Sequence, residues 1–458
     1  MVSALHVRGD MTSRAALLMA LFGASAGIAA CGTSEGESAL VQREAITSDA
    51  VRIVDFEFEG AVLAGDSVAA RGAVVRQLLY AQGILRTRSD ASGHIGNVRL
   101  SDLTETPDGD KTSIAYRAQL PVAWSKDAPL PVEGYELILP LDTTTLDAFD
   151  QKYDGSCGRS EHGRENFWHD WNPWAEGCSP AEDDVTRLGA TVTTHRKPKR
   201  KYPEYDRIWE DDRLDVVAIF GVTDKPRNEK WGTAQSWRFI DLSTSHLRDV
   251  QLVWNDSTPS LLADVTIFGT AILGRQPREV RIDVLVVDAI ADVGPDFDER
   301  YDPLSANADL IFYNGHARLG ENLHAFARKG KVTRGKYQLV LVNSCESFAL
   351  MDTTMTDRRR QVNGRRDPHG TRFLDVMGNA RPGYANNLAS VSNEILLATL
   401  NASIPLDYSS LLARMPESHA AAVYGEEDNA FDPDSWPISR HRRPMSEDQA
   451  ARMSDGEL

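Results

Sequence analysis

The chain has 458 residues, enough for two or three domains, and 41% of them are apolar. Its formal net charge of −17 argues against nucleic acid as a partner, because phosphate binding needs basic patches. The basic run "HRKPKRKYP", from His195 to Pro203, is expected to be a solvated linker between structured segments. We therefore expect an acidic, folded protein that binds no nucleic acid.

The first thirty residues have the pattern of an export signal. Arg14 precedes an apolar run that is too short to cross a bilayer, which takes about 20 residues. The segment Ile28-Ala29-Ala30-Cys31 resembles the lipobox of bacterial lipoproteins, which implies cleavage before Cys31 and a lipid on its sulfur. A plain signal peptide with a chance cysteine is the alternative. We expect a signal peptide at 1–30, a flexible tether at 31–50 and a lipid anchor in the bacterial cell envelope, on its periplasmic or surface side.

Residues 51–194 predict an α+β domain. The run from Val51 to Ala64 is rich in β-forming residues. The stretch from Asp66 to Gly83 combines a capping residue, a helical apolar face and a terminal glycine, and so predicts a helix. A hairpin is expected around the turn Pro107-Asp108-Gly109, followed by a strand and a short helix within 135–153.

The four cysteines divide into an anchor, a pair and one remaining thiol. With Cys31 assigned to the lipid, Cys157 and Cys178 flank one loop-like stretch. The simplest pairing in an oxidising compartment is therefore Cys157 with Cys178. Cys345 is then unpaired, and it is either a functional thiol or an inert buried cysteine.

The loop between Cys157 and Cys178 is rich in acidic and histidine side chains. Glu165 and His169 would share a helix face, where a metal could bind. The cluster matches no tight ligand motif, so no metal ion is predicted. No dinucleotide or phosphate-binding glycine motif is present in the sequence either, and no cofactor is expected.

Residues 205–435 predict an α/β domain, followed by a disordered tail at 436–458. The stretches 308–314 and 337–343 are short apolar runs separated by a helix-like segment. A strand, a helical crossover and a second strand form a unit in which the two strands are parallel and adjacent. Both runs are apolar throughout, as in strands that are buried on both faces.

Each of these two predicted strands ends close to a reactive side chain. His316 follows the first strand and Cys345 follows the second. Ligands in open α/β sheets bind outside the carboxyl ends of parallel strands, so the topology predicts that the two side chains converge. A thiolate is a strong nucleophile, and an imidazole can protonate a leaving amine.

The stretches "DLIFYNGHARLG" and "YQLVLVNSCES" resemble the caspase–legumain–gingipain superfamily of cysteine peptidases. The motif "NSCES" is similar to the cysteine block of legumains, in which an acidic residue and a serine follow the cysteine. The resemblance covers residues 281–429. It implies a caspase-like three-layer α/β/α sandwich with Cys345 as nucleophile and His316 as general acid/base. It also implies an oxyanion hole formed by the N–H of Cys345 and an N–H beside His316, at Gly315 or Ala317.

Two positions depart from the family pattern. Ala317 stands where the family usually has glycine after the histidine, and Ser344 stands where alanine usually precedes the cysteine. The resemblance implies a cell-envelope cysteine endopeptidase that hydrolyses peptide bonds in a protein or peptide substrate. It would contact the membrane only through its lipid. The alternative is a catalytically inactive lipoprotein that uses the same fold for binding or assembly at the envelope.

Overall fold

The computed structural model describes residues 46–65, 68–195, 200–222, 229–256, 258–383 and 385–436. The predicted signal peptide, the lipidation residue Cys31 and residues 437–458 of the predicted tail lie outside the described residues. All described residues belong to one compact unit that begins at Arg43. In the described ranges, none of the helices has the length and apolar character needed to span a membrane.

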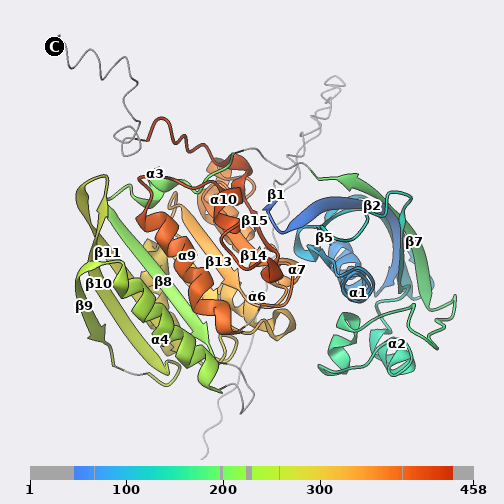
Figure 1. The fold of residues 1–458 in the computed structure, drawn as a ribbon. Coiled ribbons are helices and arrows are strands. Elements are labelled where there is room, and N and C mark those ends of the chain that lie inside the picture. Colours follow the sequence, from blue (N-terminus) through green and yellow to red (C-terminus); the bar gives the residue numbers. More distant parts are fainter. Residues whose placement is uncertain are drawn as a thin grey trace, which may run out of the picture. The chain divides into compact units, whose positions relative to one another are not determined.

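A nine-stranded sheet contains most strands of the C-terminal half (Figure 1). The strand order is β1-β15-β14-β13-β12-β8-β11-β10-β9, and the five strands from β14 to β11 are parallel to one another. The predicted pairing of 308–314 with 337–343 is confirmed, because β12 and β13 are adjacent and parallel. The strands are β1 (Ile46–Ser48), β8 (Arg213–Gly221), β9 (Arg248–Trp254), β10 (Ala263–Leu273), β11 (Gln276–Val287), β12 (Leu310–Asn314), β13 (Gln338–Asn343), β14 (Leu374–Asn379) and β15 (Ala421–Tyr424).

Helices cover both faces of this sheet. Successive side chains of a strand point to opposite faces, so Phe312 packs in one apolar cluster with Phe239 and Ile395, while Ile311 packs in another with Phe326. The arrangement explains the continuous apolar runs and confirms the α/β class. The helices are α3 (Tyr205–Ile208), α4 (Glu229–Ser245), α5 (Pro295–Asn307), α6 (Glu321–Arg328), α7 (Ser347–Leu350), α8 (Thr354–Asn363), α9 (Leu388–Leu400) and α10 (Tyr408–Leu412).

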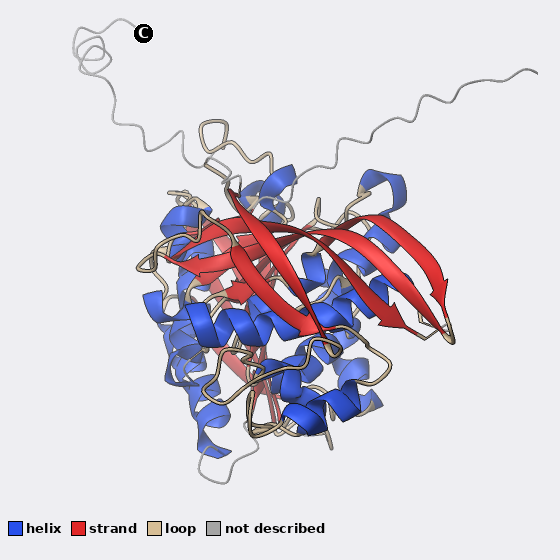
Figure 2. Ribbon diagram, turned by 90° about the vertical axis from the view of Figure 1, so that its right-hand side faces the viewer, coloured by secondary structure: helices blue, strands red, loops and turns tan. Residues whose placement is uncertain are grey.

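A six-stranded antiparallel sheet is formed by residues 51–194. Its order is β3-β5-β2-β7-β6, and β4 pairs with β5. The predicted hairpin is confirmed, with Asp108 opposite Lys111 across the turn. The long strands twist strongly, as Figure 2 shows. The elements are β2 (Val51–Ala64), α1 (Ala70–Ser89), β3 (Ser92–Gly93), β4 (Arg99–Asp108), β5 (Lys111–Ser125), β6 (Tyr135–Pro140), α2 (Leu146–Tyr153) and β7 (Val185–Thr194).

The helix of this part runs past the glycine that was expected to end it. Helix α1 passes through Gly83 and stops at Ser89, where Asp90 adopts a left-handed conformation. A Cβ atom at Gly83 would lie 2.4 Å from the carbonyl oxygen of Trp168. The glycine therefore allows the loop between the paired cysteines to pack closely on α1, and it is not a helix stop.

The first described strand belongs to the nine-stranded sheet. Ile46, Thr47 and Ser48 form β1 and pair antiparallel with β15 before the chain continues into β2. The segment assigned to a flexible tether (31–50) thus ends in a strand. The whole six-stranded sheet is inserted between the first strand of the larger sheet and β8.

The predicted disulfide is confirmed: Cys157 and Cys178 are bonded, with their Cα atoms 4.8 Å apart, and Cys345 is a free cysteine. Replacing both Cys157 and Cys178 by serine should lower the free energy of unfolding by about 3 kcal/mol, because the bond restricts the unfolded chain. Denaturant titration of the oxidised protein and the double variant measures the difference. Equal midpoints, or non-reducing peptide maps that join Cys345 to either partner, would contradict this prediction.

Candidate active site

The carboxyl ends of β12 and β13 bring the two candidate residues to the same edge of the sheet. Asn314 pairs with Asn343 at the last register position, and the Gly315 N–H donates to the Asn343 carbonyl at 3.4 Å. His316 and Cys345 each follow two residues after this pair. Both residues therefore follow the carboxyl ends of neighbouring parallel strands. The convergence of their side chains stays a prediction.

Below the candidate pair, three buried asparagines link the ends of three parallel strands. Asn343 Nδ2 donates to Asn314 Oδ1 at 3.0 Å, and Asn379 Nδ2 donates to Asn343 Oδ1 at 3.1 Å. Ser392 of α9 also donates to Asn314 Oδ1, at 2.8 Å. All three amides are fully buried, so these bonds lie in a low-dielectric setting where they hold the strand ends in fixed register.

The turn at His316 holds its backbone while the side chain is exposed. The His316 carbonyl accepts from the Tyr313 hydroxyl at 2.8 Å and from Asn322 Nδ2 at 2.9 Å. The Arg318 N–H lies 3.4 Å from His316 Nδ1.

Cys345 is partly buried, and its thiol lies 3.6 Å from the Gly383 carbonyl, to which it donates. Burial raises the pKa of the Cys345 thiol, and the neighbouring Glu346 carboxylate raises it further. The group is therefore held as a thiol at neutral pH. Attack on a carbonyl then requires a base that takes the Sγ proton as the new bond forms.

The backbone is strained beside both candidate residues. Arg318 and Leu319 have φ of 45° and 48°, and Glu346 has φ of 49°. These conformations favour glycine, and non-glycine residues in them cluster at functional sites. Three of the ten non-glycine residues with positive φ in the described ranges lie at these two turns.

Residues of the inserted six-stranded part contact the turn that carries Cys345. His169, in the loop closed by the disulfide, has Nε2 3.3 Å from Glu346 Oε2, and its Nδ1 lies 3.2 Å from Asp170 Oδ1. Arg86 of α1 pairs with Asp170 at 2.9 Å. His169 is named in the sequence analysis but is not related there to Glu346, because the two positions are 177 residues apart in the chain and no local pattern relates them.

The same interface continues along α7. The ring of His94 packs 4.4 Å from that of Phe348, and a Cβ at Gly96 would lie 2.2 Å from the Met351 carbonyl oxygen. Burial lowers the pKa of His94 to about 3, so this ring is neutral. The helix that follows Cys345 is thus packed directly against the inserted part.

Of the amides expected to line an oxyanion hole, that of Gly315 already donates within the sheet. The amides of Ala317 and Cys345 remain as candidates. The described ranges contain no group of three or more His, Cys, Asp or Glu side chains that could hold a metal ion.

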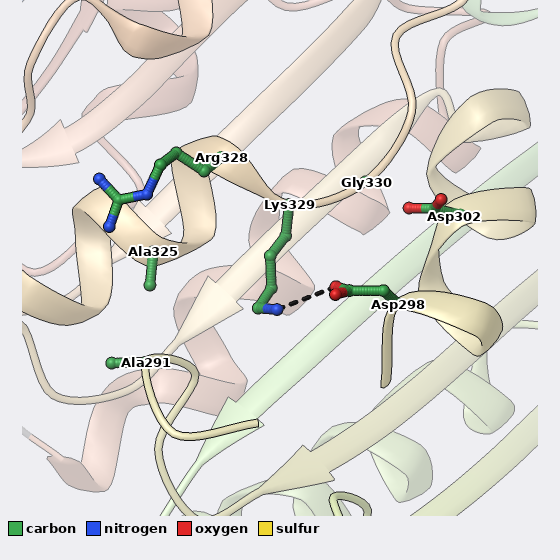
Figure 3. Close-up of a pocket in the computed structure, with 7 residues that line it drawn as sticks. All are labelled: Ala291, Asp298, Asp302, Ala325, Arg328, Lys329 and Gly330. Atoms are coloured by element: carbon green, nitrogen blue, oxygen red, sulfur yellow. Dashed lines mark hydrogen bonds and ion pairs between the residues drawn. The ribbon is translucent and has the colours of Figure 1, made fainter. Parts of the chain in front are cut away.

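A surface pocket lies between α5 and α6 (Figure 3). Its volume is about 470 Å³, and its lining includes Asp298, Asp302, Arg328 and Lys329. Lys329 points to Asp298, with Nζ 2.9 Å from a carboxylate oxygen. Neither His316 nor Cys345 lines it, so the pocket belongs to no predicted site.

Three comparisons with known proteins gave no match. No family model matches the chain, and no curated protein or solved structure matches it. The functional assignment therefore depends on the residues and their geometry.

Proposed function

We propose that the protein is a cysteine peptidase of the cell envelope that uses His316 and Cys345 to hydrolyse peptide bonds. The single observation that carries the proposal is the parallel register of β12 and β13, which puts both residues at equivalent positions beyond the same sheet edge. A mixed sheet with helices on both faces and the pair at its carboxyl edge is what the resemblance to caspase-like peptidases implies. Anchoring through Cys31 is part of the same proposal.

The chemistry follows from the two side chains. Cys345 Sγ attacks the carbonyl carbon of the scissile bond, and its proton passes to the His316 imidazole. The imidazolium then protonates the leaving amine as the C–N bond breaks, which leaves a thioester on Cys345. Water, deprotonated by His316, attacks the thioester carbonyl carbon, the C–S bond breaks, and the carboxylic acid is released. The proton held by His316 returns to Cys345 Sγ. The amides of Ala317 and Cys345 are the donors available to the developing oxyanion.

A protein substrate suits this arrangement. His316 is exposed and Cys345 is only partly buried, so an extended peptide can reach both from solvent. No metal ion or organic cofactor is needed for any step. The rival proposal is a non-catalytic envelope protein, and the raised pKa of Cys345 is the observation that favours it, because catalytic thiols usually have lowered values.

Replacing Cys345 by alanine should abolish peptide hydrolysis and change the melting temperature little, because a thiol at the solvent end of a strand adds little core packing. Hydrolysis of a fluorogenic peptide library by the purified protein, together with calorimetry, tests this. His316→Ala should reduce the rate by at least about a hundredfold. His324→Ala, on α6, is a matched control that should keep the rate.

A wild-type protein that neither cleaves the library nor reacts with an electrophilic thiol probe at Cys345 would exclude the peptidase. A large loss of stability in Cys345→Ala would instead indicate a structural cysteine.

A further inference from the structure

We propose that Glu346 and His169 form a positioning pair through which the disulfide-closed loop controls the reactivity of Cys345. The inference rests on the proposed function, since it treats Cys345 as the nucleophile. On this proposal the inserted six-stranded part contributes a residue to the site. His169 belongs to that part, and Glu346 belongs to the turn after β13.

The contact between the two residues is buried and directional. Both side chains are 8% exposed, and their nearest atoms are 3.3 Å apart. His169 is oriented from its other nitrogen by Asp170, which Arg86 holds in turn. A buried carboxylate is costly unless it has a partner, and His169 is the partner that the inserted part supplies to Glu346.

The backbone at Glu346 indicates that its side chain has a role. Its φ of 49° is a left-handed conformation in which a residue with a Cβ is strained and glycine is not. Its N–H donates to the Arg381 carbonyl at 3.2 Å, which fixes the turn. The strain is thus retained at the residue that follows Cys345 and whose carboxylate reaches the inserted part.

The carboxylate also acts electrostatically on the neighbouring thiol. Glu346 disfavours the thiolate of Cys345 by charge repulsion, in addition to the effect of burial. The hydrogen bond from His169 to the Glu346 carboxylate partly compensates this negative charge. Loss of the histidine should leave the repulsion uncompensated, whereas loss of the glutamate should remove it.

Other charged groups surround the pair and have to be kept constant in a test. Asp170 and Arg86 lie behind His169, and the ring of His162 lies 5.5 Å from that of His169. Arg381 lies at the next strand end and pairs with Asp90 at 2.6 Å. Of these, the exposed His162 offers a matched control, because it neighbours His169 on the same loop.

The test is the rate of Cys345 alkylation by iodoacetamide between pH 6 and 10, quantified by peptide mass spectrometry on the full chain with its disulfide intact. Glu346→Gln should raise the rate at pH 7.5 by about three- to tenfold and move the pH midpoint down, because a neighbouring negative charge is removed. His169→Gln should lower the rate by about threefold. His162→Gln should leave it unchanged.

The double variant decides whether the two residues act together. If they form a pair, His169→Gln has no further effect in the Glu346→Gln background. An equal effect of His169→Gln in both backgrounds, or no effect in either, would overturn the inference. Melting temperatures of all variants show whether each is folded. Because alkylation is measured without peptide hydrolysis, an inactive protein that shows this pattern would disprove the proposed function and leave the pairing intact.

Discussion

Replacing Asn343 by alanine is expected to lower the free energy of unfolding by about 3 kcal/mol and to slow peptide hydrolysis by at least about tenfold. Asn343 is the middle of the three linked amides, and it joins Asn314 to Asn379 in a fully buried setting. Its loss removes partners from both neighbours and leaves a cavity where the ends of β12, β13 and β14 meet. Denaturant titration and the rate of fluorogenic peptide cleavage measure the two effects.

Asn401→Ala is the matched control for this prediction. Asn401 is exposed and follows α9, and its side-chain amide donates to the Leu397 carbonyl of that helix at 2.9 Å. The change should cost less than about 0.5 kcal/mol. Similar losses in the two variants would mean that the buried amides do not hold the strand ends.

Replacing Glu426 by glutamine should stabilise the protein at alkaline pH and have little effect at acidic pH. Glu426 is fully buried, and desolvation raises its pKa from 4.5 to about 9. A raised pKa means that the folded state binds the proton more tightly than the unfolded state. The contribution of Glu426 to the stability of the folded state is therefore complete below about pH 4.5, and it is lost as the pH rises toward 9.

The expected gain for Glu426→Gln at pH 8.5, relative to pH 5, is about 3 kcal/mol in the free energy of unfolding. Burial also raises the pKa of Asp375 to about 7. Ionisation of Asp375 therefore lowers the free energy of unfolding as the pH rises, over a lower range of pH than Glu426. Denaturant titrations at several pH values measure the effect. The exposed Glu417→Gln should show no such dependence, and a variant whose advantage over wild type is constant with pH would refute the prediction.

The central strands could be predicted from the sequence because burial on both faces leaves them apolar throughout. Strand β14 lacks that signal, since its six residues include Asp375, a glycine and Asn379. The structure tolerates the buried Asp375 because the hydroxyls of Tyr337 and Tyr408 donate to it, and so does Asn429. These three partners of Asp375 are distant from it in the chain, so no local sequence pattern predicts their hydrogen bonds.

In the candidate site, too, some features could be predicted from the sequence and others could not. Topology alone could predict that His316 and Cys345 follow neighbouring strand ends, because parallel neighbours end at one edge. The contact between Glu346 and His169 could not be predicted. It joins the turn after β13 to the loop closed by the disulfide, and it depends on how the inserted part packs on α7. The hydrogen bond that occupies the Gly315 amide was also beyond prediction, because it depends on the exact register of β12 and β13.

The position of β1 has a consequence for the order in which the chain folds. Among the described strands, β1 pairs with β15, and the Ser48 hydroxyl donates to the carbonyl of Ala421, 373 residues away. In a chain that emerges with its N-terminus first, the first strand has to wait until nearly all later residues are present. The edge of the larger sheet then closes last, so a truncated chain that lacks β15 would leave β1 exposed to proteases.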